Sequence, residues 1–245
     1  MQKELLRMEN IVKTFPGVKA LNNAAITVHA GEVMGFMGEN GAGKSTLMNV
    51  LGGVFPADSG DIYIEGKKVA IHSIHESQAL GVAFIHQELA LEPYLTIAEN
   101  IFLGREMKNS FGMVSKDKMA EAARPFLERV GLDVDPNEFV GRLSIGQQQM
   151  VEIAKSFSLN AKILILDEAT SSVDTRTEVL IQKGMEKLME NRTCFVIAHR
   201  LSTIRDADLI LVMKDGDIVE VGDHQELMAK NGFYTQLYNS QFEES

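Results

Sequence analysis

The sequence predicts an α/β fold in which helices cover a mostly parallel β-sheet, with an antiparallel β front part and an inserted α-helical subdomain. Three observations predict this fold: strand-like alternation near the N-terminus, a helical pattern between about residues 95 and 160, and three later apolar runs separated by helical patterns. With 245 residues and 45% hydrophobic content, the chain is long enough to bury one large core or two unequal ones.

The first elements are predicted to be antiparallel strands. Residues 5–15 (LLRMENIVKTF) and 25–38 (AITVHAGEVMGFMG) alternate between apolar and polar side chains, which is typical of strands with one buried face. Residues 61–69 (DIYIEGKKV) predict a hairpin that turns at Glu65 and Gly66. The N-terminal part of the chain is therefore expected to form its own small sheet.

The middle of the chain is predicted to be helical. Met119, Ala123, Phe126, Leu127 and Val130 recur at the spacing that places them on one face of a helix. Pro125 lies inside this stretch and argues against an unbroken helix. A second apolar stripe follows and predicts a second helix; its members are Met150, Ile153, Ala154 and Phe157.

The remaining strands are predicted from short apolar runs. These runs are GVAFIH at 81–86, KILILD at 162–167, TCFVIA at 193–198 and DLILVM at 208–213. Helical patterns between the last three indicate parallel strands joined by helices. Cys194, the only cysteine, lies inside one of these runs, so we expect a small core residue and not a reactive thiol.

The charge excludes some classes of function. Lys and Arg number 24 against 34 Asp and Glu, giving a formal net charge of −10, which repels nucleic acid over most of the surface. We therefore expect no nucleic-acid partner. The sequence contains neither an 18-residue apolar run nor a signal-peptide pattern, so we expect any membrane role to depend on a partner protein.

A phosphate-binding loop is the most specific motif. GENGAGKST at 38–46 fits G-x-x-x-x-G-K-[ST], follows a predicted strand and precedes a predicted helix, which indicates a P-loop NTPase core. Backbone N–H groups would surround the phosphates, Lys44 would supply a positive charge, and Ser45 would bind Mg²⁺. The predicted nucleotide-binding residues here are Gly38, Asn40, Gly41, Ala42, Gly43, Lys44, Ser45 and Thr46.

Two adjacent carboxylates complete the predicted chemistry. Asp167 ends the buried run ILIL and is predicted to bind the magnesium ion. Glu168 is predicted to orient or deprotonate a water molecule in line with the γ-phosphate. The alternative is that Glu168 caps the next helix, although Thr175-x-x-Glu178 is a better capping box nearby.

Together these and further motifs resemble the ATPase cassette of ATP-binding cassette (ABC) transporters over almost the whole chain. LSIGQ at 143–147 resembles the family signature, with Ile145 where glycine is commoner. The further matches are Gln87 for the Q-loop, SSVD (ending at Asp174) for the D-loop, His199 for the switch histidine and Phe15 for the aromatic residue against adenine.

The resemblance implies a role for each of these residues, and each also has an ordinary structural interpretation. It implies that Gln87 and His199 contact the γ-phosphate, that Gln87 also binds the metal, and that Asp174 contacts the other subunit. Ser144, Gly146 and Gln147 would bind the γ-phosphate of a nucleotide held by the opposite subunit. Alternatively, Ser144-x-x-Gln147 is a capping box, Asp174 favours a helix N-terminus, Phe15 is a core residue, and Gln87 and His199 are ordinary polar residues.

The detailed resemblance changes along the chain. Up to about residue 168 it is closest to the ATPases of sugar importers of the ribose or galactose type, as in FPGVKAL and LSIGQQQMVEIAKS. From about residue 169, ATSSVDTRTE and IAHRLSTIRDADLILVMKDGDIVEVGDHQEL resemble exporter cassettes. This change predicts a chimera joined within or close to LILDEAT.

The sequence thus predicts an ATP- and Mg²⁺-dependent ATPase that powers transmembrane transport as a head-to-tail homodimer. The expected organisation is 1–90 for the first part of the ATP-binding core, 91–160 for the helical signature subdomain and 161–245 for the second part. We expect a cytoplasmic protein held at the inner face of the membrane by permease subunits. Two alternatives are a chimera that binds ATP but hydrolyses little, and a soluble ABC ATPase unconnected with transport.

Overall fold

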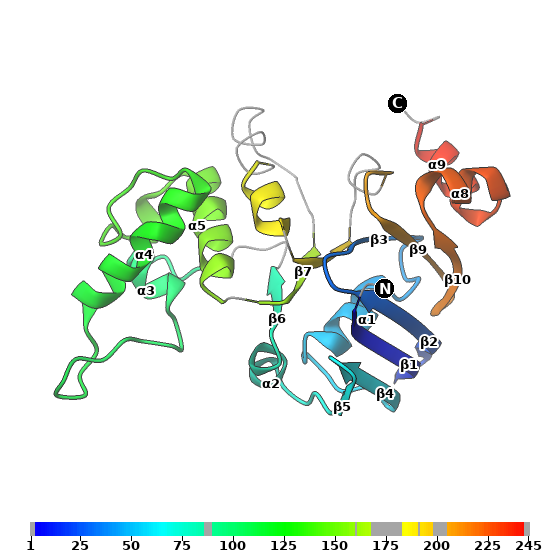
Figure 1. Cartoon of the computed structure of the whole chain (residues 1–245), viewed down its shortest axis with the longest axis horizontal. Coiled ribbons are helices and arrows are strands. Elements are labelled where there is room, and N and C mark those ends of the chain that lie inside the picture. The colour runs from blue at the N-terminus through cyan, green and yellow to red at the C-terminus, as the bar shows by residue number, and fades with distance from the viewer. Residues whose placement is uncertain are drawn as a thin grey trace. The chain divides into compact units, whose positions relative to one another are not determined.

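The computed structural model describes residues 3–85, 90–159, 161–167, 183–190, 192–197 and 205–242. These residues form an α/β structure with two β-sheets and several groups of helices (Figure 1). The chain divides into two compact units. The first contains the described residues of Met1–Phe84, Lys162–Ala169 and Asn191–Ser245, and the second those of Ile85–Ala161 and Thr170–Glu190.

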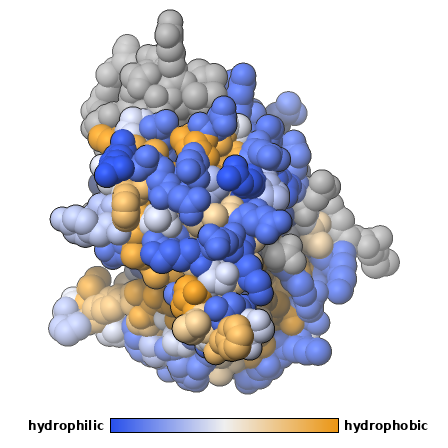
Figure 2. Space-filling model, turned by 90° about the vertical axis from the view of Figure 1, so that its left-hand side faces the viewer, coloured by the Kyte–Doolittle hydropathy of each residue, from blue (hydrophilic) through white to orange (hydrophobic). Residues whose placement is uncertain are grey.

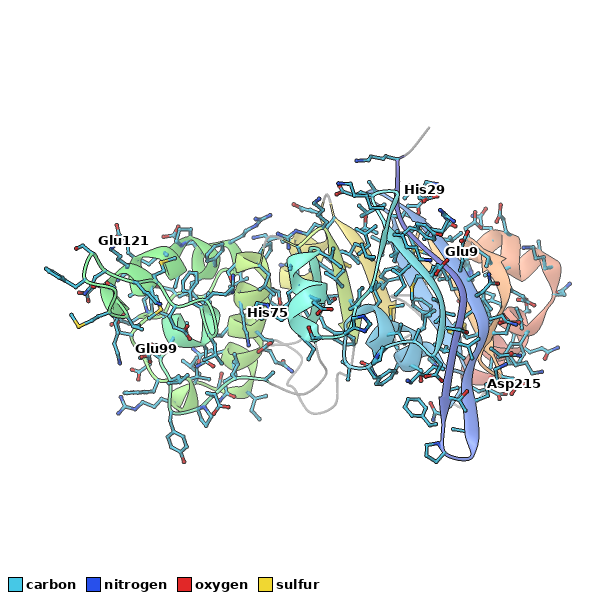
Figure 3. The ribbon with its side chains drawn as sticks, turned by 90° about the horizontal axis from the view of Figure 1, so that it is seen from below. Glu9, His29, His75, Glu99, Glu121 and Asp215 are labelled. Carbon is cyan, nitrogen blue, oxygen red and sulfur yellow. The ribbon has the colours of Figure 1, made fainter. Side chains whose placement is uncertain are left out.

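The first unit contains an antiparallel sheet in the order β2-β1-β4-β5. Its strands are β1 Glu4–Phe15, β2 Val18–His29, β4 Ser59–Ile64 and β5 Lys67–Val69. Glu65 and Gly66 have φ angles of 51° and 77° at the β4–β5 turn, as the predicted hairpin requires. Figure 3 shows Glu9 of β1 and His29 of β2 on this sheet.

The second sheet has the order β10-β9-β3-β8-β7-β6. Strands β3, β7, β8 and β9 are parallel where they pair, whereas β10 is antiparallel to β9. The strand bounds are β3 Val33–Gly38, β6 Val82–Ile85, β7 Ile163–Asp167, β8 Thr193–Ile197, β9 Leu209–Lys214 and β10 Asp217–Gly222. The predicted mostly parallel sheet is confirmed.

The core of the first unit lies between these sheets around α1, Lys44–Leu51. Leu47, Met48 and Leu51 of this helix are fully buried against apolar residues of both sheets. Since α1 begins directly after the predicted phosphate loop, this packing fixes the position of the loop. The unit also contains α2 Ile74–Ala79, α8 His224–Lys230 and α9 Phe233–Phe242.

The second unit is helical. Its described elements are α3 Ile97–Ile101, α4 Lys116–Val130, the 3₁₀ helix η1 Val140–Arg142 and α5 Ile145–Ser158, and residues 183–189 are also helical. The predicted apolar stripe Met150, Ile153, Ala154 and Phe157 is buried. None of the helices in the described part of the chain has the length and hydrophobicity needed to cross a bilayer.

Helix α4 continues through Pro125, contrary to the interruption that proline suggested. Proline lacks an N–H group, so it leaves the carbonyl of Glu121, four residues earlier, without its helical partner. Both residues lie on the exposed side of the helix, where water can hydrate that carbonyl. Figure 3 shows Glu121 on the outer side of this unit.

Candidate functional site

The phosphate loop connects the end of β3 at Gly38 to the start of α1 at Lys44. Gly43 is the N-cap of α1, with φ 103°, and no side chain caps the helix. Because the first N–H groups of a helix have no intrahelical partner, this uncapped end offers donors to an anion. The first turn also lacks an acidic residue that would repel phosphate.

Two glycines of this loop fit where a side chain would clash. A Cβ atom on Gly43 would lie 2.6 Å from the carbonyl oxygen of Ala20 in β2. A Cβ atom on Gly38 would clash with the carbonyl oxygen of Met213 in β9. The motif glycines therefore let the loop approach the strands on either side as well as a phosphate.

The turn between β9 and β10 supports the loop from outside the motif. The N–H of Gly216 donates to the carbonyl of Ala42 at 3.1 Å, and the carbonyl of Gly216 accepts from the N–H of Asn22 at 2.8 Å. The neighbouring residue Asp215 is labelled at this end of the first unit in Figure 3. A residue more than 170 positions away from Ala42 thus holds the phosphate loop in place.

Lys44 is held within the loop. Its Nζ donates to the carbonyl of Gly38 at 2.6 Å and to that of Glu39 at 3.0 Å. These carbonyls orient the ammonium group next to the uncapped helix end, where it adds positive charge to that of the helix dipole. The other predicted loop residues, of which Asn40, Gly41 and Ser45 are exposed and Thr46 half-buried, lie on the same short segment.

The register of the parallel strands brings Asp167 to the edge of the sheet that carries the loop. In β8, Ile197 pairs with Asp167 of β7 on one side and with Phe36 of β3 on the other. Neighbouring strands are ~5 Å apart, so the backbone of Asp167 lies ~10 Å from that of Phe36, two residues before Gly38. The Asp167 side chain lies outside the described atoms, so its role as a ligand of Mg²⁺ together with Ser45 stays a prediction.

The LSIGQ motif lies at the N-terminus of α5. Ser144 is the N-cap, its Oγ accepts from the N–H of Gln147 at 3.3 Å, and Gln147 Oε1 accepts from the N–H of Ser144 at 3.0 Å. The capping box is therefore confirmed. Gly146 is buried, whereas Ser144 and Ile145 are exposed and accessible to a ligand.

Phe15 is half-buried at the end of β1. Its ring packs edge-to-face on Phe55, with centroids 5.2 Å apart and an interplanar angle of 88°. Lys13 Nζ lies 5.6 Å and 5.4 Å from these two rings, and it forms an ion pair with Asp58 at 2.8 Å. The contact of Phe15 with adenine stays a prediction.

Four predicted site residues lie outside the described residues: Gln87, Glu168, Asp174 and His199. The alternative capping box at Thr175 and Glu178 lies there too. The described strands nevertheless end close to three of them in sequence, since β6 ends at Ile85, β7 at Asp167 and β8 at Ile197. The roles of these residues stay predictions.

No cluster of three or more His, Cys, Asp or Glu side chains suitable for a metal occurs among the residues described above. Cys194 is fully buried in β8, and burial raises the pKa of its thiol to about 12. The thiolate is therefore strongly disfavoured near neutral pH, which confirms the prediction of an unreactive core cysteine.

Two supporting residues were not predicted. Gly216 gives only the local signal of an Asp-Gly turn, and nothing nearby in sequence indicates its contact with Ala42. Phe55 follows the apolar pattern of α1 and packs partly buried against the core, and its ring also makes the T-shaped contact with Phe15. Both contacts join segments that are distant in the sequence.

Residues 21–171 match the sequence profile of the family described as ABC transporter. This match covers more than half of the chain and includes the phosphate loop, the LSIGQ motif and the acidic pair. This chain belongs to the ABC transporter family. The fold agrees, since an ATP-binding cassette of an ABC transporter in its ADP conformation superposes with a TM-score of 0.78 at 30% identity, over 96% of this chain and 98% of that one.

Several sugar-import proteins are similar to this ABC cassette. The xylose import ATP-binding protein XylG of Geobacillus kaustophilus is 42% identical over 249 residues, covering 100% of this chain and 49% of the relative. The ribose import ATP-binding protein RbsA of Clostridium perfringens is 44% identical over 216 residues (86% and 43%). The arabinose import ATP-binding protein AraG 1 of Burkholderia cenocepacia is 46% identical over 213 residues (86% and 42%). The cassette spans about half the length of the curated relatives it matches.

The comparisons do not support the predicted change to exporter type after residue 168. XylG aligns with the whole cassette, including the segment that we assigned to exporters. A bacterial Atm1-family ABC exporter with ATP bound is also similar in structure, with a TM-score of 0.77 and 32% identity over 98% of this chain and 42% of that one. The family and the sugar-importer resemblance are confirmed.

Proposed function

We propose that this cassette binds Mg-ATP and hydrolyses it to power the import of a sugar. The uncapped N-terminus of α1, with Lys44 held beside it by two loop carbonyls, is the observation that carries the proposal. The relatives XylG, RbsA and AraG 1 are named for the import of xylose, ribose and arabinose, which supports import. Because these three sugars differ, we propose only a small sugar as the class of substrate.

The proposed chemistry rests on positioning and charge. The loop from Gly38 to Thr46 holds the phosphates through its N–H groups, and Lys44 offsets the negative charge that develops on the transferred phosphoryl group. Ser45, Asp167 and Gln87 would hold Mg²⁺, which screens the phosphate oxygens. Glu168 would position the attacking water and His199 would contact the γ-phosphate, while Phe15 stacks against adenine.

The proposed working form is a head-to-tail homodimer. Ser144, Gly146 and Gln147 of one subunit would face the γ-phosphate bound by the phosphate loop of the other, and Asp174 would lie across the interface. The dipole of α5 and the exposure of Ser144 support this role, because a helix N-terminus attracts an anion that reaches it from outside.

The proposed partners are transmembrane permease subunits that hold the cassette at the inner face of the membrane. Closing and opening of the ATP-bound dimer would drive the permease. The relatives support this assignment because they are named import ATP-binding proteins. We propose no nucleic-acid partner, in keeping with the formal charge of −10.

Steady-state hydrolysis of Mg-ATP, measured beside Glu168→Gln and Lys67→Met, tests the proposed enzyme. We expect turnover in the parent protein and in Lys67→Met, whose altered side chain is exposed in β5. Glu168→Gln should bind ATP yet lose at least about 99% of the turnover, since the attacking water is no longer activated. Turnover that persists in Glu168→Gln would remove that residue from the mechanism.

The alternatives predict different results. A cassette of mixed origin that only binds ATP would bind nucleotide without turnover in any variant. A chimera stays a proposal that rests on the exporter-like motifs alone. Scoring residues 1–168 and 169–245 separately against importer and exporter cassettes tests it, and assignment of both segments to importers would end it.

A soluble ABC ATPase that acts on nucleic acid would bind RNA or DNA at low salt.

A further inference from the structure

The turn that joins β1 to β2 extends past the end of β4, its neighbour in the sheet. The pairing of β1 with β2 continues to Phe15 and Val18, whereas its pairing with β4 ends at Val12. Beyond Val12 these two strands form a two-stranded hairpin, whose turn is the blue loop at the bottom of Figure 3. Since a two-stranded hairpin alone is marginally stable in water, the position of Phe15 at its end depends on further contacts.

Asp58, in the segment that follows α1, supplies several of these contacts. Lys13 Nζ donates to Asp58 Oδ1 at 2.8 Å, and the N–H of Thr14 donates to Asp58 Oδ2 at 2.7 Å. The N–H of Asp58 donates to the carbonyl of Val12 at 2.9 Å. The bonds from Lys13 and Thr14, that from Lys13 first, lower the pKa of the Asp58 carboxyl. Asp58 is therefore ionised near neutral pH and contacts each of the three residues that precede Phe15.

The side chain of Lys13 is enclosed by the same segment. It is only 12% exposed, and its Nζ also donates to the carbonyl of Pro56 at 2.8 Å. The ammonium group lies 5.6 Å from the centroid of Phe15 and 5.4 Å from that of Phe55. An ammonium group withdrawn from water is costly unless it is paired and hydrogen-bonded, so Asp58 and the carbonyl keep Lys13 in place beside the rings.

An exposed apolar side chain would not by itself mark such a place. Figure 2 shows orange apolar patches among hydrophilic side chains on one face of the molecule, and exposed apolar side chains are common on folded proteins. Phe15 differs because an enclosed lysine and its carboxylate partner hold the strand that ends with its ring.

The same hairpin lies beside the phosphate loop. Val18 of β2 pairs with Phe15, and two residues later a Cβ atom on Gly43 would lie 2.6 Å from the carbonyl oxygen of Ala20. Two residues of a strand span ~7 Å. The Phe15 ring and the proposed phosphate site are therefore within reach of a single nucleotide.

We propose that Lys13 and Asp58 are positioning residues for the base of the nucleotide, because their ion pair fixes the end of β1 and so orients the Phe15 ring before ATP binds. This inference rests on the proposed function, in which Phe15 stacks against adenine. It deepens that function by assigning two residues that act through Phe15. A contact that is ordered in advance loses less entropy on binding, so breaking the ion pair should weaken the base contact.

Affinities for Mg-ATP and for magnesium tripolyphosphate, which has no base, test the proposal. We expect the parent protein to bind ATP more tightly, and Phe15→Ala to weaken ATP binding roughly tenfold through the loss of stacking. Lys13→Met and Asp58→Asn should each weaken it roughly fivefold and leave the affinity for tripolyphosphate unchanged. Added to Phe15→Ala, Lys13→Met should have no further effect, because both changes act on the same ring.

A second ion pair in the same sheet supplies matched controls. Lys68 of β5 pairs with Asp61 of β4 at 2.7 Å. We expect Lys68→Met and Asp61→Asn to bind ATP and tripolyphosphate as the parent does. Melting temperatures measured for all variants, with tripolyphosphate affinity, show whether the phosphate loop keeps its fold.

GTP separates positioning from direct recognition of the base. Stacking on an aromatic ring tolerates different bases, so Lys13→Met should lose GTP affinity by the same factor as ATP affinity. A loss confined to ATP would overturn the proposal, because Lys13 would then contact an edge of adenine.

Other results would also overturn it. They include equal affinity of the parent for ATP and tripolyphosphate, equal loss of both affinities in Lys13→Met, and equal ATP affinity in Lys13→Met and Lys68→Met. If the parent bound neither ligand, the proposed function would fail and this inference with it. If the parent bound both ligands and turned over ATP, whereas Lys13→Met behaved like its control, only the positioning role would fail.

Discussion

The N-termini of α1 and α5 are both predicted to bind phosphate, but they differ in how their N–H groups are satisfied. At α1 the N-cap is Gly43, and no side chain caps the helix. At α5 the N-cap is Ser144, and its capping box with Gln147 is complete. The protein leaves the end of α1 without a side-chain cap, whereas it caps the end of α5.

This difference suggests two modes of binding. A phosphate at α1 supplies hydrogen-bond acceptors that the protein leaves out, so binding there should be strong and should stabilise the loop. A phosphate at α5 approaches an end that Ser144 and Gln147 already stabilise, so its contribution is smaller and readily reversible. A contact made and broken in each cycle by another subunit suits the second kind of end.

The largest expected effect is at the α1 end. Lys44→Met removes the charge that lies against the loop and its bonds to the carbonyls of Gly38 and Glu39. We expect ATP turnover to fall at least ~100-fold and nucleotide affinity to fall as well. Turnover and binding of a fluorescent ATP analogue measure this, with Lys67→Met as the control. Near-parental turnover would mean that α1 does not hold the reacting phosphates.

The next effect concerns the stability of the same end without nucleotide. Gly43→Ala places a Cβ atom 2.6 Å from the carbonyl oxygen of Ala20, whereas Gly41→Ala meets nothing within 4 Å. Both residues have positive φ, 103° and 86°, so both variants carry backbone strain of about 1–2 kcal/mol. We expect thermal unfolding to show a further loss of about 1–3 kcal/mol for Gly43→Ala alone. Equal melting temperatures would show that the strands do not constrain the loop.

Ser144→Ala tests the capped end. Loss of an N-cap costs about 1 kcal/mol of folding stability, and Ser73→Ala, at the N-cap of α2, supplies a control with the same local change. We expect both variants to melt at slightly lower temperature, and only Ser144→Ala to lose turnover, by roughly tenfold, with ATP binding by the single chain unchanged. If the two variants kept the same turnover, Ser144 would have a structural role alone.

The smallest effect is on the body of α5. Burial raises the pKa of the Glu152 carboxyl, opposed by Lys155. At pH values between the unfolded pKa and the raised folded pKa, the folded state therefore keeps a proton that the unfolded state has lost. This carboxyl lowers the free energy of unfolding as pH rises through its folded pKa. Glu152→Gln should raise the melting temperature by a few degrees at pH 7 and by less at pH 4, with exposed Glu128→Gln as the control. A gain independent of pH would contradict this cause.

Local features of the site were predictable from the sequence. Each of these features is formed by residues within a stretch of nine positions or fewer and has a distinct residue pattern. They are the phosphate loop, the capping box at Ser144 and the turn at Glu65 and Gly66. The buried environment of Cys194 was predictable because it lies within an uninterrupted apolar run.

Features that depend on distant contacts were not predictable. The support of Ala42 by Gly216 and the packing of Phe15 on Phe55 arise only when segments from different parts of the chain come together. Helix α4 continues through Pro125 because the proline faces solvent, which the residue alone does not reveal. The turn at residues 109–113 is held by the Asn109 side chain, whose Oδ1 accepts from the N–H groups of Phe111 and Met113, and the sequence does not reveal that its apolar residues are exposed.

The N-termini of α1 and α5 are proposed to act on one nucleotide from two subunits. Specific ATPase activity measured against protein concentration, with Mg-ATP in excess, tests it most directly. We expect activity per chain to rise with concentration and then level off, and sedimentation of Glu168→Gln with ATP to show a dimer. Activity per chain that stays constant down to concentrations where sedimentation shows only monomer would contradict the claim.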